Sequence, residues 1–192
     1  MARKSREEAA LTLDAIKQSA FDLGSAEGME ALSIARIADD LGMSKSGVAG
    51  HFENKTDLQL AAIEKAATAF TDGVVRANDW RHPGADRLRG YMHGWLTYVE
   101  KRHEVGGCFL TAASFEYDDR PGVVRDAVAE VWRRWMRVLA TESKNAGLNG
   151  ARTAFRLHSI VTEAMWMHQL FDDPRGWQIA REQVEEVLAE AH

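Results

Sequence analysis

Two serines flank a lysine at positions 44–46, and the small residues Gly47, Ala49 and Gly50 follow closely. A lysine ammonium can neutralise a phosphate or donate to a guanine, and serine hydroxyls can bond to phosphate oxygens. If these residues open a helix, the free N–H groups of its first turn can bind phosphate as well. The nearly bare face of such a helix would leave clearance for DNA. The alternative is a capped surface turn in an ordinary helical bundle.

The flanking residues predict two short helices joined by a tight turn, over 33–41 and 44–52. Ser33 and Ser44 are typical N-caps, and Gly42 can adopt the left-handed conformation that ends a helix. Leu32 and Ile37 have the spacing of a hydrophobic staple. This is the pattern of a helix-turn-helix. Its inward-facing apolar residues are Ile34, Ile37, Leu41, Val48 and Phe52.

The composition favours an all-α protein, because only three prolines interrupt 192 residues and 45% of them are hydrophobic. We expect a three-helix helix-turn-helix head over residues 1–57 and a larger helical bundle over 58–192, with about nine helices in all. Gly24 is expected to end the first helix, Asn54 to cap the fourth, and Pro121 to lie in the first turn of the seventh. The expected helices are 7–23, 33–41, 44–52, 54–78, 85–103, 109–117, 121–145, 151–171 and 174–191.

The chain-wide features argue for a cytoplasmic protein. The sequence has no uncharged apolar run of 18 residues, so no membrane span is expected, and its N-terminus has no secretory signal. One cysteine, Cys108, rules out a disulfide within the chain; it is either a redox sensor or inert core. The net charge is −5, and the head has seven basic and ten acidic residues. A surface for DNA must therefore be a local patch.

Residues 7–60 resemble the DNA-binding head of the tetracycline-repressor (TetR) family of bacterial transcription regulators. The matching residues are Ser33, Ile37, Ala38, the run 41–44, Gly47, Val48, His51, Phe52 and Lys55. The stretches 106–110 and 115–126 look like one branch of that family. At the position of Ala49 many members have an aromatic residue that contacts the DNA backbone, so this chain departs from the pattern there.

The resemblance and the residue chemistry together predict a DNA-binding set in the head. The resemblance implies that His51 and Lys55 touch phosphate, although His51 can equally be a half-buried packing ring. Arg36, in the first turns of the second helix, is a further expected phosphate contact. The full set is Ser33, Arg36, Ser44, Lys45, Ser46, Gly47, Ala49, Gly50, His51 and Lys55.

Aromatic residues and methionines in the body suit an apolar cavity for a small organic ligand. Such residues at helical spacing are also what an ordinary core contains. The resemblance implies that this body binds an effector, with the fifth to eighth helices as walls. The expected ligand-binding residues are Met92, Trp95, Phe109, Phe115, Trp132, Met136, Met165 and Trp166.

The last two helices resemble the family's dimerisation pair. Two such helices from each subunit would form a four-helix interface, and a dimer would place two heads about one DNA turn apart, roughly 34 Å. The expected dimerisation residues are Phe155, Ser159, Thr162 and Leu170 in the eighth helix, and Ala180, Val184, Val187 and Leu188 in the ninth.

The sequence thus predicts a homodimeric, ligand-responsive transcription regulator, most simply a repressor released from a palindromic DNA operator by a small apolar effector. The alternative is a helical ligand-binding or scaffolding dimer that has lost DNA binding. No nucleophile elbow, phosphate loop or paired carboxylates suggest an enzyme, and no cofactor is expected. The histidines lack metal-ligand spacing, and Asp118 and Asp119 are explained more simply as caps of the seventh helix.

Overall fold

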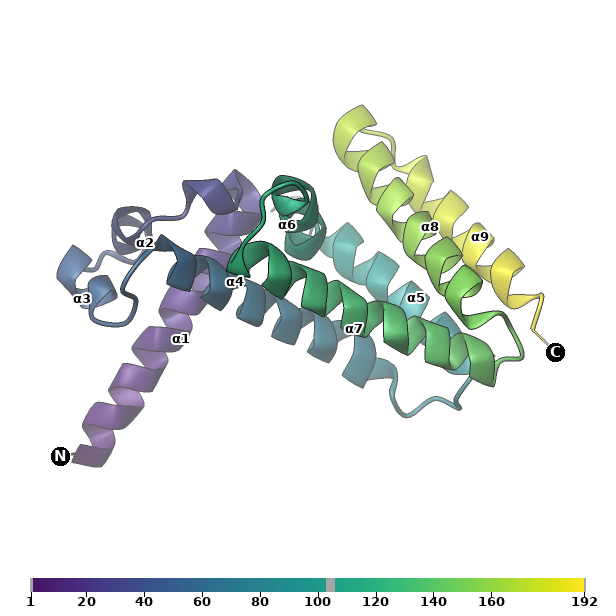
Figure 1. The fold of residues 1–192 in the computed structure, drawn as a ribbon, viewed down its shortest axis with the longest axis horizontal. Coiled ribbons are helices and arrows are strands. Elements are labelled where there is room, and N and C mark those ends of the chain that lie inside the picture. Colours follow the sequence, from purple (N-terminus) through teal and green to yellow (C-terminus); the bar gives the residue numbers. More distant parts are fainter. Residues whose placement is uncertain (1, 103–105, 192) are drawn as a thin grey trace. The chain divides into compact units, whose positions relative to one another are not determined.

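The computed structural model describes residues 2–102 and 106–191, and every regular element within these ranges is helical (Figure 1). This confirms the all-α prediction and the nine α-helices for the part of the chain described. The α-helices are α1 (Ala2–Glu27), α2 (Ile34–Leu41), α3 (Lys45–Ala49), α4 (Lys55–Phe70), α5 (Ala85–Lys101), α6 (Phe109–Tyr117), α7 (Val123–Asn145), α8 (Gly150–Phe171) and α9 (Arg175–Leu188).

The chain divides into two compact units whose three boundaries fall inside α4, at the start of α6 and inside α7. Unit 1 comprises residues 1–67 and 109–128, and unit 2 comprises residues 68–108 and 129–192. Helix α6 therefore belongs to the same compact unit as the helix-turn-helix, although about forty residues separate it from α4 in sequence. The functional division into residues 1–57 and 58–192 stays a prediction, because it describes roles and not compactness.

Local capping explains where the short helices of unit 1 begin and end. The Ser33 hydroxyl accepts from the Arg36 N–H at 3.1 Å, and the Ser44 hydroxyl accepts from the Gly47 N–H at 3.1 Å. Between them Gly42 has φ of 61°, the left-handed conformation that favours glycine. These bonds satisfy helix-start N–H groups that have no partner within the helix. The predicted caps of α2 and α3 are confirmed.

Helix α1 continues past Gly24, where the sequence predicted its end, so that prediction is wrong. The physical reason is tertiary packing. A Cβ on Gly24 would lie 2.7 Å from Cε2 of Phe109, so the missing side chain lets α6 approach α1 closely. One turn away Phe21 meets the same ring edge-to-face, with centroids 5.6 Å apart. This glycine serves close packing and does not end the helix.

The fourth helical run ends at Asn78 as predicted, but its winding changes along the way. Helix α4 is followed by the π-helical turn η2 (Thr71–Val75) and the 3-10 turn η3 (Arg76–Asn78). The buried Asn78 side chain donates to the Val74 carbonyl at 2.9 Å and so occupies an acceptor within this irregular stretch. Single π-helical turns are often found at functional sites.

Three later helix bounds also differ from prediction. Helix α7 begins at Val123 and not at Pro121, because Gly122 between them has φ of 147°, which is not helical. Helix α9 ends at Leu188, three residues before the predicted end. Helix α5 ends at Lys101, and the predicted end at residue 103 lies outside the described residues.

Unit 2 is built around α5, which packs against η2, α8 and α9. Helices α8 and α9 lie side by side along much of their length (Figure 1). The face of α5 that points into the unit contributes Leu88, Met92, Trp95, Leu96 and Val99, each at most 1% exposed. Across the described ranges, no helix is both long enough and apolar enough to cross a membrane.

Candidate functional site

Helix α3 is held by a buried anchor and presents a small-residue face to solvent. Val48 is fully buried, and Phe52 just beyond the helix is 8% exposed. The residues that point away are Ser44, Lys45, Ser46, Ala49 and Gly50, all exposed. The structure therefore places these five predicted DNA-binding residues on one accessible surface, while the predicted Gly47 between them is half-buried.

Lys45 is the one long cation on this face. No ion pair or hydrogen bond of its side chain is found among the described residues. The Ser44 hydroxyl is used by the cap and lies 3.1 Å from the Ser46 hydroxyl. A phosphate approaching α3 would meet an exposed ammonium and a second hydroxyl, which suits charge-assisted binding.

Arg36 lies on α2 and is engaged by a carboxylate of its own unit. Its guanidinium donates to Glu27 through Nε at 3.3 Å and Nη2 at 2.6 Å. This bidentate pair lowers the pKa of Glu27 below its usual value, with the hydrogen bond as the main cause. Ser33 is occupied as the cap of α2, and His51 is half-buried. A contact from Arg36 to DNA would compete with Glu27.

Lys55, at the start of α4, is held in the same manner by Glu30. Its ammonium donates to the Glu30 carboxylate at 2.8 Å and to the Glu30 carbonyl. The Tyr117 hydroxyl donates to the other carboxylate oxygen at 2.6 Å, and the Arg120 guanidinium lies 3.4 Å from it. These hydrogen bonds, that of Lys55 first, lower the pKa of Glu30. Burial, followed by the Glu30 hydrogen bond, raises the pKa of Tyr117.

The end of α6 also fixes the backbone that leads into the helix-turn-helix. The Glu116 carboxylate accepts from the N–H groups of Met29 and Glu30 at 2.9 and 2.8 Å. Gln59 donates to the Met29 carbonyl at 3.1 Å and to the Tyr117 hydroxyl at 2.7 Å. We call these four residues, Glu30, Gln59, Glu116 and Tyr117, the η1 clamp, after the 3-10 turn η1 (Met29–Ala31) that they hold.

Sequence reasoning missed the η1 clamp because its members come from three separated segments. The one local signal was Gly28, whose φ of 85° allows the chain to turn next to Glu116. Nothing in the spacing of Glu116 and Tyr117 indicated their partners. The clamp ties α6 to the segment directly before α2.

The predicted effector residues are only partly gathered in one place. In unit 2, Trp95 and Trp132 lie in a ring cluster with Phe70, Trp135 and His158, with centroids 5.0–6.3 Å apart. The indole N–H groups of Trp95 and Trp135 are buried and have no hydrogen-bond acceptor among the residues that the structure describes. Burial lowers the pKa of His158, so the neutral ring is favoured. We call these five residues the aromatic cluster.

The other predicted effector residues lie elsewhere or make no ring contact with this cluster. Phe109 belongs to unit 1, where it packs on Phe21, and Phe115 in the same unit is 65% exposed. Trp166 is 47% exposed and stacks edge-on with Phe171. Met92 and Met165 are buried in unit 2, and Met136 is half-buried. Cys108 is buried, so the inert and the redox interpretation both remain.

The predicted dimerisation residues fall into an exposed and a buried group. On α8, Phe155 and Leu170 are more than 60% exposed, Ser159 is exposed, and Thr162 is half-buried. The four residues predicted on α9 are at most 3% exposed and form part of the core of unit 2: Ala180, Val184, Val187 and Leu188. The outward apolar residue of α9 is Ile179, which is 47% exposed.

A groove of about 360 Å³ runs between α8 and α9 on this outward side. Ser159, Ile160, Met167 and Ile179 are among the residues that line it. The structure thus places an apolar groove between exposed apolar side chains, which is a suitable surface for a second copy of the chain.

Comparison with known proteins identifies both parts of the chain. The family model described as "Bacterial regulatory proteins, tetR family" matches residues 16–62, and that described as "Tetracyclin repressor-like, C-terminal domain" matches residues 84–184. No curated protein matches the chain.

Solved structures share the fold over nearly the whole chain. A TetR transcriptional regulator from Chloroflexus aurantiacus has 22% identity and a TM-score of 0.82, with 98% of each chain covered. A TetR-family regulator from Streptomyces coelicolor has 21% identity and a TM-score of 0.81, with 94% of this chain and 95% of that chain covered. AibR, solved with isovaleryl coenzyme A and operator DNA, has 20% identity and a TM-score of 0.72, with 91% and 97% covered.

The second family model spans more than half of the sequence, and the first covers the helix-turn-helix that carries the exposed face of α3. The chain therefore belongs to the tetracycline-repressor family of transcriptional regulators.

Proposed function

We propose that this protein is a homodimeric repressor that binds a palindromic operator and leaves it when a small organic effector binds. The observation that carries the proposal is the accessible face of α3, where Lys45 stands without an ion pair among the described residues. A helix of this kind enters the major groove with its N-terminal residues toward the bases.

The test is a fluorescence anisotropy titration on a palindrome from the region upstream of the gene. Binding should weaken as salt rises, with a slope of roughly −0.9 in log K against log salt for each phosphate contact. A protein that shows no salt-dependent preference for any upstream fragment would end the proposal.

Lys45→Ala should weaken operator binding by roughly five- to tenfold, because a charge-assisted contact contributes on the order of 1 kcal/mol or more. Lys65→Ala is the matched control, since Lys65 also lies in unit 1 but pairs with Asp14 at 2.7 Å. Equal effects of the two substitutions would remove Lys45 from the interface.

The aromatic cluster supports the effector part of the proposal. Two buried indole N–H groups without acceptors are costly, and a bound ligand with an acceptor atom would satisfy them. AibR was solved with an acyl coenzyme A, which shows that one protein of this fold takes an acyl compound. We therefore propose an effector with an apolar body and a carbonyl or similar acceptor. Trp95→Phe should reduce the thermal stabilisation that such a compound gives and leave operator affinity without ligand unchanged.

The alternative of a helical dimer without DNA binding has structural support of its own. Arg36 and Lys55 are both paired with carboxylates in unit 1, and the head has more acidic than basic residues. A selection from random DNA sequences separates the two proposals, because a scaffold would enrich no sequence whereas an operator-binding dimer would enrich a palindrome.

A further inference from the structure

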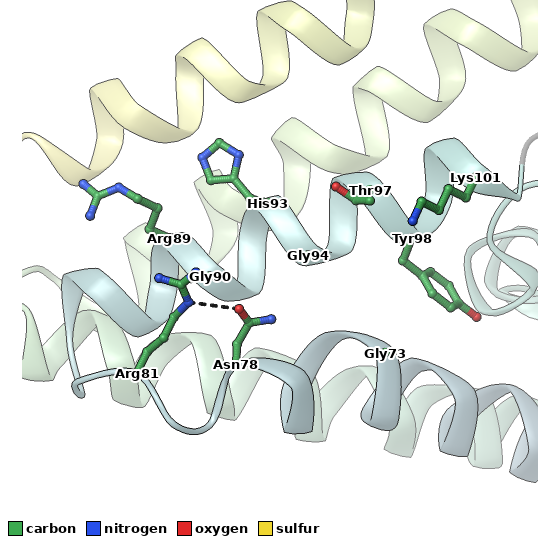
Figure 2. A pocket seen from close by; sticks show the side chains of 10 residues that line it. All are labelled: Gly73, Asn78, Arg81, Arg89, Gly90, His93, Gly94, Thr97, Tyr98 and Lys101. Carbon is green, nitrogen blue, oxygen red and sulfur yellow. Dashed lines mark hydrogen bonds between the residues drawn. The ribbon is translucent and has the colours of Figure 1, made fainter.

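Unit 2 contains a cavity of about 550 Å³ beside α5, and it adjoins the aromatic cluster at Tyr98, whose ring centroid lies 5.9 Å from that of Phe70. Its walls come from η2, η3, the turn after η3, and α5 (Figure 2). Residues two apart on a helix lie about 200° apart around its axis, so His93 and Trp95 point to opposite sides of α5. The residues that line it are Gly73, Asn78, Arg81, Arg89, Gly90, His93, Gly94, Thr97, Tyr98 and Lys101.

Glycine creates the floor of this cavity. A Cβ on Gly90 would lie 2.4 Å from Cδ of Arg81 and 2.6 Å from Oδ1 of Asn78, and a Cβ on Gly94 would lie 3.0 Å from Nδ2 of Asn78. A glycine within a helix costs about 1 kcal/mol relative to alanine. Gly90 and Gly94 lie one turn apart in α5 and reduce its intrinsic helix stability. Because they have no side chains, the Asn78 and Arg81 side chains can lie directly against α5.

The lining is cationic in a chain whose net charge is −5. Arg81, Arg89 and Lys101 are cations, and none of the ten lining residues is Asp or Glu. Arg89, His93, Thr97 and Lys101 follow one another at four-residue intervals. They therefore form a single stripe along α5, about 18 Å long.

Carboxylates outside the lining neutralise only part of this charge. Glu185 of α9 bonds to Arg89 at 3.0 Å and to His93 at 2.8 Å, and Asp86 pairs with Arg81 at 3.2 Å. Within the part of the chain that the structure describes, no ion pair involves Lys101. Glu100 next to it is already paired with Arg181 at 2.7 Å. Counting only residues 2–102 and 106–191, the Lys101 end of the cavity is therefore the position with unbalanced positive charge.

Arg81 is oriented before any ligand arrives. Its Nε donates to Oδ1 of Asn78 at 3.0 Å, as the dashed line in Figure 2 shows, and Asn78 is itself fixed by the Val74 carbonyl. A guanidinium held in this way loses little freedom on binding a carboxylate or a phosphate. The Tyr98 ring, which also lines the cavity, supplies apolar contact for the rest of a ligand.

We propose that this cavity binds a small organic anion, a carboxylate or a phosphate monoester with a compact apolar body. The site is additional to the effector site proposed at the aromatic cluster, and its volume is in the range of small-molecule sites. Lys101 binds the anionic group, Arg81 orients it, and the π-helical turn that carries Gly73 forms the opposite wall.

The test uses isothermal titration calorimetry on the full chain without DNA, so its outcome does not depend on operator binding. The probes are 2-naphthoate, 2-naphthyl phosphate and the neutral 2-naphthamide, and the two anions separate a carboxylate from a phosphate preference. At least one anion should bind about tenfold more tightly than the amide, since charge-assisted hydrogen bonds are roughly twice as strong as neutral ones.

Lys101→Gln should lower the affinity for that anion about tenfold and leave the affinity for the amide unchanged. The matched control is Lys144→Gln, which removes the same charge from an exposed position of unit 2 outside the cavity. Gly90→Ala should also reduce anion binding, with circular dichroism to show that the helices persist. The proposal is overturned if no anion binds, if acid and amide bind equally, or if the two lysine variants behave alike.

Discussion

At the scale of single residues, Glu30 is a carboxylate of unit 1 that gathers three partner side chains. It receives hydrogen bonds from Lys55 and Tyr117 and an ion pair from Arg120. If Lys55 is to reach a phosphate, it must leave this carboxylate. The interaction energy between Glu30 and Lys55 then subtracts from operator affinity, so the position of α6 can influence DNA binding through one side chain.

The lowered pKa of Glu30 makes a prediction about acid stability. Its ionised form is the one that Lys55 and Tyr117 stabilise, so its contribution is complete above the unfolded value of 4.5 and is lost as pH falls through the lower folded value. Wild type should be more stable than Glu30→Gln at pH 7, by less than about 1 kcal/mol because the side chain is exposed. Thermal melts at pH 7 and at about pH 3 should show the gap closing. A gap that is the same at both pH values would contradict the assignment.

Replacing Gly24 with alanine should lower the stability of the protein, whereas the same substitution at an ordinary helix glycine raises it. Alanine usually stabilises a helix by about 1 kcal/mol relative to glycine. Here the new Cβ would meet the buried Phe109 ring at 2.7 Å, so Gly24→Ala should instead lower the free energy of unfolding by about 1–2 kcal/mol. Urea denaturation of the wild type and of Gly24→Ala measures this change in the free energy of unfolding.

Gly50→Ala is the control for this prediction. The nearest atoms to its Cβ would be 3.5 Å away, and Gly50 already has helical φ and ψ. The free energy of unfolding of the Gly50→Ala variant should therefore stay the same or rise by up to about 1 kcal/mol. A stabilising Gly24→Ala would mean that Phe109 moves aside freely.

At the scale of elements, the helix-turn-helix was predictable because its signals are local. Ser33, Gly42 and Ser44 act within four residues of their own positions, so spacing alone located the starts of both short helices, although α3 ends at Ala49 and not at residue 52 as predicted. The start of α4 is equally local, since Asp57 N–H donates to Asn54 and Glu53 N–H donates to Asp57.

The elements that were mispredicted depend on partners distant in sequence. Gly24 has the residue type of a helix end, and only the ring of Phe109, 85 residues later, shows why the helix continues. The stripe from Arg89 to Lys101 has regular spacing that was visible in the sequence. Only the structure shows that this stripe lines a cavity with glycines at its floor and walls from η2 and η3, because residue spacing does not reveal a cavity.

The η1 clamp predicts a stability loss when α6 can no longer hold η1. In Glu116→Gln one carboxylate oxygen becomes an amide nitrogen, so one of the two N–H groups of Met29 and Glu30 loses its acceptor. We expect the free energy of unfolding to fall by about 1–2 kcal/mol in urea denaturation. Glu53→Gln, at an exposed position in the same unit, should leave it unchanged. Equal stability of the two variants would show that η1 does not depend on α6.

At the scale of the whole molecule, the α8–α9 surface is proposed to join two subunits. Phe155, Leu170 and Ile179 are exposed around a groove, although four of the α9 residues predicted from sequence turned out to be core. The helical period showed which positions are apolar, but not which of the two apolar faces of α9 points outward.

Leu170→Lys should shift the assembly from dimer to monomer in sedimentation velocity at micromolar concentration, because a charge would be buried at the contact. Leu11→Lys is the control, since Leu11 in α1 is 72% exposed and lies in unit 1. A wild-type monomer, or a Leu170→Lys variant that remains dimeric, would place the interface elsewhere.

All six tryptophans of the chain, including the three of the aromatic cluster, fall within unit 2. Intrinsic tryptophan fluorescence therefore does not report on changes confined to unit 1. It reports on unit 2, where both ligands are proposed to bind. A single tryptophan introduced into unit 1 would add a fluorescence signal from that unit. The order in which the two units unfold could then be measured directly.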